Sequence, residues 1–178
     1  LLGGVLAGSP SAGPVPSVNP EVAATRLLDG FAAGDTAAQV AQLEQRVESN
    51  PADAEGLALL GLAYQQRARE TGDPGFYPRS EAALRRSLAR ADTNDLALGG
   101  LAALAATRHR FAEARHLAER ALRINAYSTA ALGILGDALV ETGEYDAAFH
   151  TCDRMAALKP NTASYVRVAY ARELLGRT

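Results

Sequence analysis

The segment from residue 98 to residue 161 contains one pattern of apolar residues twice, with the two copies 34 residues apart. In each copy, apolar residues three or four apart form a run, a short polar turn follows, and a second run completes the pattern. This spacing is typical of two amphipathic helices. A single helical hairpin cannot bury its own apolar face, so the period predicts hairpins stacked into a solenoid, whose function lies in a surface.

The same register extends in both directions along the chain. Leu60 matches Leu101 at a distance of 41 residues, whereas Ser80 matches Ala114 at 34. Seven extra residues therefore separate the two helices of the earlier unit. The prolines and glycines of segment 72–78 favour that segment as the insertion, because they forbid a continuous helix there. Downstream, Tyr165 begins a further unit, and the sequence ends before the second helix of that unit.

These residues resemble the tetratricopeptide repeat, whose pattern is a Leu-Gly pair, an aromatic one turn later, a small residue early in the second helix and a terminal proline. The matching positions are Leu60-Gly61 with Tyr64, Leu135-Gly136 with Leu139, the Gly143-Glu144-Tyr145 turn, Ala148, and Pro160-Asn161. The resemblance covers residues 54–176. It departs from the family in having no tryptophan and in having Ala105 where an aromatic is expected. It implies an all-α protein, an α-α superhelix of antiparallel helix pairs.

The chain divides accordingly into six parts. They are an apolar and Pro/Gly/Ser-rich tail (1–20), a divergent first hairpin (21–52), a repeat with an insertion between its helices (53–94), two regular repeats (95–128 and 129–161), and the first helix of a truncated repeat (162–178). The divergent hairpin would cap the end of the solenoid, where atypical sequence is expected.

In the family, the first helices of successive repeats line a concave groove. By resemblance, the groove residues here are Leu62, Gln65, Gln66, Leu96, Gly99, Ala103, Ala106, Gly133, Asp137, Val140, Val166 and Tyr170. Segment 96–107 contains no charged residue, and a helix that is apolar all round is normally buried. Either the curl of the solenoid or a bound partner must cover it. The sequence favours a protein-interaction scaffold that binds an extended or helical segment; a regulatory or targeting segment of a larger enzyme or of a secretion or envelope machine is the alternative.

The composition of this groove constrains the partner to a protein or peptide. Chaperone-adaptor members of the family hold an acidic C-terminal tail through lysine, arginine and asparagine, but here Leu62, Gly99 and Ala103 occupy such positions, so a carboxylate grip is not expected. The net charge of −2 gives no electrostatic reason to expect nucleic acid. Self-association is expected through the N-terminal tail or through the open C-terminal helix, whose second helix is missing.

No residue pattern indicates catalysis, a cofactor or a metal. The lone Cys152 cannot form an intramolecular disulfide, and it falls on the inward face of a helix. His116 and His150 are one repeat apart, which in stacked helices means about 10 Å, too far to share a metal. There is no phosphate-binding glycine loop and no nucleophile elbow. The sequence therefore predicts a protein that is not an enzyme.

The first 20 residues carry no charge and begin with an apolar run, Leu1–Gly8, that resembles the end of a secretory signal. An export remnant and a plain low-complexity linker both remain open. All but one of the 18 basic residues are arginine, which favours a GC-rich bacterial genome. A bacterial extracytoplasmic or membrane-anchored location is favoured, with the cytoplasm as the alternative. The tail is also a candidate occupant of the groove.

Overall fold

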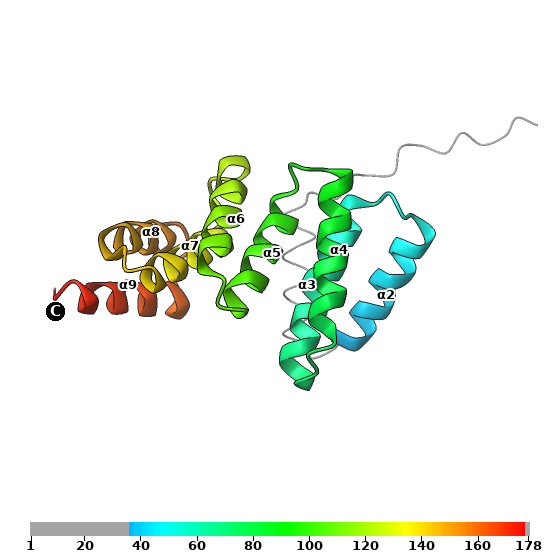
Figure 1. Cartoon of the computed structure of the whole chain (residues 1–178), viewed down its shortest axis with the longest axis horizontal. Helices are drawn as coiled ribbons and strands as arrows, with labels where there is room; N and C mark the ends of the chain where they lie inside the picture. The colour runs from blue at the N-terminus through cyan, green and yellow to red at the C-terminus, as the bar shows by residue number, and fades with distance from the viewer. Residues whose placement is uncertain (1–35, 177–178) are drawn as a thin grey trace, which may run out of the picture.

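The computed structural model describes residues 36–176, and within that range every regular element is an α-helix (Figure 1). The helices are α2 (Thr36–Ser49), α3 (Ala54–Thr71), α4 (Phe76–Arg90), α5 (Asp95–Thr107), α6 (Phe111–Ile124), α7 (Thr129–Glu141), α8 (Tyr145–Leu158) and α9 (Thr162–Leu174). The prediction of an all-α protein is confirmed. The tail and the first helix of the predicted hairpin lie outside the described residues.

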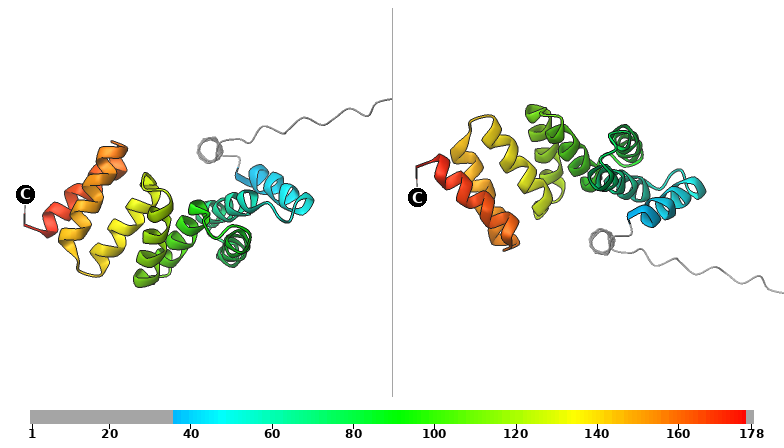
Figure 2. Two further views of the ribbon diagram at one scale, coloured as in Figure 1. Left: turned by 90° about the horizontal axis from the view of Figure 1, so that it is seen from above. Right: turned by 90° about the horizontal axis from the view of Figure 1, so that it is seen from below.

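The helices pair as hairpins that stack in chain order into a curved superhelix (Figures 1 and 2). The hairpins are α3 with α4, α5 with α6 and α7 with α8, while α2 packs on α3 and α9 packs on α8. The first helices α3, α5, α7 and α9 also contact one another in turn, whereas α4, α6 and α8 contact only the first helices beside them. The first helices therefore form one continuous layer, as the predicted superhelix requires.

Each first helix of a repeat begins at a side-chain cap. Asp53, Asn94, Ser128 and Asn161 precede α3, α5, α7 and α9, and the side chain of each accepts a hydrogen bond from a backbone N–H three residues later, at 2.8, 3.0, 3.3 and 2.9 Å. Such caps satisfy N–H groups that have no partner within the helix. The caps recur at matching places in the repeat, so the register of the sequence is also a register of helix starts.

The small residues of the Leu-Gly pairs mark the crossing points within the hairpins. A Cβ atom built on Gly61 would lie 2.5 Å from Cγ of Leu84 on α4, and one on Gly136 would lie 2.7 Å from Sγ of Cys152 on α8. No real Cβ atom sits this close to another heavy atom. The prediction that these glycines allow two helices to approach closely is therefore confirmed, and Cys152 is buried as predicted.

The seven inserted residues are not all where the sequence placed them. Helix α3 has 18 residues against 13 in α5 and in α7, so most of the insertion lengthens the C-terminal end of α3, up to Thr71. Gly72 then ends the helix with a φ of 70°, and α4 begins at Phe76. Pro78 fits in the first turn of α4 because the N–H that proline lacks would have no helical partner there.

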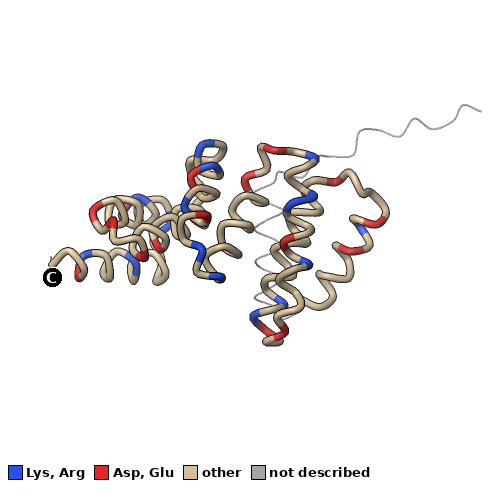
Figure 3. Tube along the Cα trace, viewed as in Figure 1, with Lys and Arg blue, Asp and Glu red and all other residues tan. Residues whose placement is uncertain are grey.

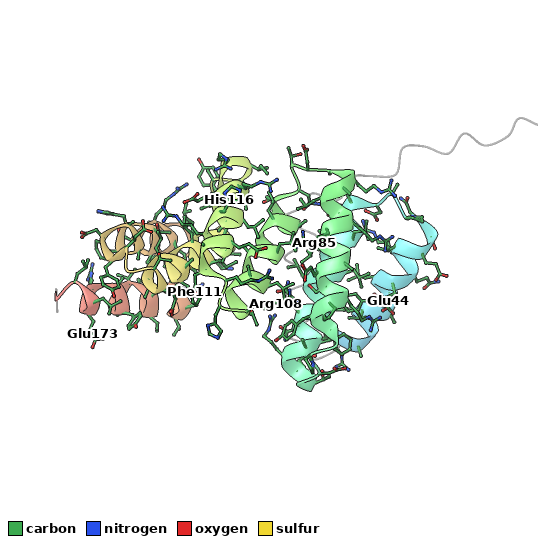
Figure 4. The ribbon with its side chains drawn as sticks, viewed as in Figure 1. Glu44, Arg85, Arg108, Phe111, His116 and Glu173 are labelled. Atoms are coloured by element: carbon green, nitrogen blue, oxygen red, sulfur yellow. The ribbon has the colours of Figure 1, made fainter. Side chains whose placement is uncertain are left out.

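Ion pairs tie neighbouring helices together. Arg79 on α4 binds Glu44 on α2 at 2.5 Å, and Glu44 also accepts a hydrogen bond from the hydroxyl of Tyr64 at 2.5 Å. Glu81 on α4 accepts from Arg85 of the same helix and from Arg108 at the end of α5, at 2.8 and 2.6 Å; Glu44, Arg85 and Arg108 are labelled in Figure 4. The bond from Arg108 is the main cause that lowers the pKa of Glu81.

Candidate binding groove

The predicted groove residues lie on the layer of first helices, but they differ in how far they reach solvent. Asp137, Val166 and Tyr170 are exposed; Leu62, Gln66, Leu96, Gly99, Ala103, Ala106 and Val140 are partly buried; and Gln65 and Gly133 are buried. The available surface therefore consists of an apolar part on α3 and α5 and a more polar part on α7 and α9.

The apolar part is centred on one face of α5. Leu96, Gly99, Ala103 and Ala106 follow each other at intervals of three or four residues, so they share a face of the helix. No heavy atom outside the helix lies within 4 Å of a Cβ built on Gly99. The opposite positions, including Leu98 and Leu101, are buried in the core. The solenoid thus covers most of this uncharged helix and leaves one small-residue face partly open.

Two of the predicted residues have structural partners instead. The amide nitrogen of the Gln65 side chain donates to the Gly100 carbonyl at 2.8 Å and to Oγ of Ser80 at 3.1 Å, both buried bonds. A buried amide is costly to separate from such partners, so Gln65 serves to join α3, α4 and α5. Gly133 faces Met155, and a Cβ there would meet the Met155 side chain at 3.4 Å.

The polar part is organised by a residue that the sequence reasoning missed. Arg167 on α9 binds the Asp137 carboxylate on α7 with two parallel hydrogen bonds of 2.8 Å each. Such bidentate pairs fix side-chain geometry as well as neutralising charge, and the hydrogen bond to Asp137 raises the pKa of Arg167. The two residues are 30 positions apart, and only the packing of α9 on α7 reveals the pair.

Large apolar side chains reach the surface at one end of the described chain. The exposed ones are Ile124, Tyr127, Tyr145, Leu158, Tyr165, Val166 and Tyr170, all in the stretch from residue 124 onward. Aromatic side chains are enriched in protein interfaces, where they supply contact area at little entropic cost. This distribution marks the C-terminal end of the superhelix as the more adhesive part of the described surface.

Charge and metal-ligand placement give no competing site in the described residues. Acidic and basic residues alternate along the helices, without a large region of one sign in this view (Figure 3). Within residues 36–176, no three His, Cys, Asp or Glu side chains are grouped to hold a metal ion. None of the described helices has the length and apolar character needed to cross a membrane.

Comparison with known proteins agrees with this geometry. Residues 105–172 match a sequence model of the tetratricopeptide repeat family. The fold resembles a crystal structure of MamA, with a TM-score of 0.63 and 21% identity over 84% of both chains, and a second MamA structure, MamA AMB-1, with a TM-score of 0.63 and 25% identity over 86% of this chain and 87% of that one. The first such repeat domain of human RPAP3, solved by NMR, gives a TM-score of 0.57 and 17% identity over 67% of this chain and 94% of that domain. No curated protein sequence matches the chain.

The stacked hairpins and the open face of the first helices define a helical-repeat scaffold. With the family match across α5 to α9, the chain is a tetratricopeptide repeat protein, as its 34-residue period predicted. Proteins of this fold act in general as interaction scaffolds.

Proposed function

We propose that the chain binds an extended or helical segment of a partner protein across its layer of first helices. The open face of α5 carries this proposal: Leu96, Gly99, Ala103 and Ala106 stay partly exposed on a helix without charge between residues 96 and 107, and the space above Gly99 is empty. Small residues let a partner backbone approach closely, as in the recognition of extended peptides and of helices in grooves.

The chemistry of the surface favours an apolar or proline-bearing segment over an acidic tail. None of the predicted groove residues is basic, and the one arginine found beside them, Arg167, is already neutralised by Asp137. A carboxylate tail would therefore lose its hydration without gaining a counter-ion. Leu62 at one side of the α5 face adds apolar contact, since it packs close to Gly100.

The experiment selects a displayed library of extended and helical peptides on the chain and measures the affinity of a selected peptide for two variants. Ala103→Glu places a charge in the open face and should weaken binding at least tenfold, because a desolvated charge opposes an apolar ligand. Ala82→Glu makes the same change at an exposed position of α4, and it should leave binding unchanged. Circular dichroism should show equal helicity for both variants. Equal affinity for the two variants, or a failure to select any peptide, would contradict the proposal.

A further inference from the structure

In the three complete hairpins, one position of the first helix is always covered by the second helix. This position is the fourth residue after the cap: Leu57, Leu98 and Leu132 occupy it, with exposed fractions of 0%, 0% and 1%. The small residue four places later, Gly61 in the first hairpin and Gly136 in the third, meets the second helix directly. These positions together define the socket for a second helix.

Helix α9 presents the same socket without a second helix from the described part of the chain. Tyr165 lies four residues after the cap Asn161, as Leu132 does after Ser128, yet its exposed fraction is 58%. Ala169 is exposed at the place of Gly136, and Arg172 is exposed at the place of Leu139. The other side of α9 is buried through Ser164, Val168 and Ala171, where it packs on α8 and α7.

The exposed side of α9 is complementary to itself. If a second α9 lies antiparallel with Ala169 against Ala169, the two small residues allow close approach at the crossing. Tyr165, four residues before this centre, then faces Glu173 and the neighbouring Arg172 of the second copy, which lie four and three residues after it. Arg172 already stands over the ring of Phe149 at 5.6 Å, and a tyrosine ring would offer it a second aromatic face.

We propose that the chain forms a two-fold dimer in which the α9 helices of two copies fill each other's empty socket. The dimer uses Tyr165, Ala169 and Arg172, whereas the proposed groove uses Val166 and Tyr170 of the same helix, so the two proposals can fail separately. A single pair of helices buries less than the 1,200–2,000 Å² or so of a standard stable interface, so the expected dimer dissociates in about the micromolar range.

Sedimentation equilibrium of the chain of residues 1–178, from about 1 to 500 μM to bracket a micromolar dissociation constant, tests the proposal. The unchanged chain should pass from monomer to dimer as its concentration rises. Ala169→Arg puts two cations at the crossing and should remain monomeric throughout, with unchanged helicity by circular dichroism. Ala112→Arg, at an exposed position of α6, is the matched control and should dimerise like the unchanged chain.

A cross-link tests the orientation of the helices. In a Cys152→Ala background, Ala169→Cys lies on the two-fold axis, so mild oxidation should yield a disulfide-linked dimer, which requires Cα atoms about 4.4–6.8 Å apart. The proposal is overturned if the unchanged chain stays monomeric at the highest concentration, if Ala169→Arg still dimerises, or if Ala169→Cys fails to cross-link in dimers that form. A monomer whose α9 is protected from hydrogen exchange would assign the socket to another helix.

Discussion

The crossing of α7 and α8 can be tested through Gly136 and the residue it faces. A Cβ on Gly136 would lie 2.7 Å from Sγ of Cys152, whereas the next atom, Cγ2 of Thr151, would lie at an ordinary 3.9 Å. Overpacking of this kind costs about 1–3 kcal/mol, and alanine gains about 1 kcal/mol over glycine in a helix. Gly136→Ala should therefore lower the free energy of unfolding by up to about 2 kcal/mol.

Removing the sulfur should reverse the sign of this effect. In a Cys152→Ala background the close contact is gone, and Gly136→Ala should raise the free energy of unfolding by about 0.5–1 kcal/mol. The coupling energy between the two substitutions should then be about 1–3 kcal/mol. Urea unfolding of the four proteins, followed by circular dichroism, measures each term, provided that the urea dependence of the free energy is the same in all four.

The reasoning is refuted if Gly136→Ala has the same effect in both backgrounds to within about 0.5 kcal/mol, because the two helices then do not cross at this point. Glu144→Ala is the control for a change in the same hairpin. Its side chain is 44% exposed and pairs with Arg115 on the surface, so its loss should change the free energy of unfolding by no more than about 0.5 kcal/mol.

Three further predictions follow from the described residues. Burial and the hydrogen bond to Glu44 raise the pKa of Tyr64 to about 12 from 10.0, so the stability that this shift contributes is present below pH 10.0 and is lost between pH 10.0 and about 12; comparing alkaline unfolding of the unchanged chain with Tyr64→Phe checks this. Burial raises the pKa of the Cys152 thiol, so a thiol reagent at about pH 8 should react only as fast as the protein opens, and rapid labelling of the native chain would contradict its burial. Far-ultraviolet circular dichroism should show a mainly helical protein, and a substantial sheet contribution would contradict the fold.

The regular part of the fold was predictable because it repeats. The 34-residue period fixed the pairing of α5 with α6 and of α7 with α8, and the caps Asn94 and Ser128 stand one period apart. The insertion was placed too late because prolines and glycines mark where a helix cannot continue, but they do not show how far the preceding helix extends. The C-terminal end of α3, up to Thr71, has ordinary helix-forming composition, and only its length in the structure reveals the inserted turns.

The candidate site was predictable only in outline. Periodicity shows which face of a first helix a residue occupies, and it placed Gly99 and Ala103 on a face that the structure leaves partly open. It does not show which long side chains find partners on neighbouring helices. Gln65 is satisfied by α4 and α5, and Arg167 is paired with α7, because of distances between helices that no spacing within one helix encodes. The predictions for residues 1–20, including export and occupation of the groove, concern a segment outside the described residues and stay predictions.

Binding on the layer of first helices is tested most directly by mapping where a bound peptide lies. A peptide selected on the chain and carrying a paramagnetic label would broaden the NMR signals of amides close to it, in an isotope-labelled sample of the unchanged chain. The account predicts broadening at Leu62, Gly99 and Ala103 and none at the exposed Ala82 and His116 on α4 and α6. Broadening centred on Ala82 or His116, with the signals of Gly99 and Ala103 unaffected, would contradict it.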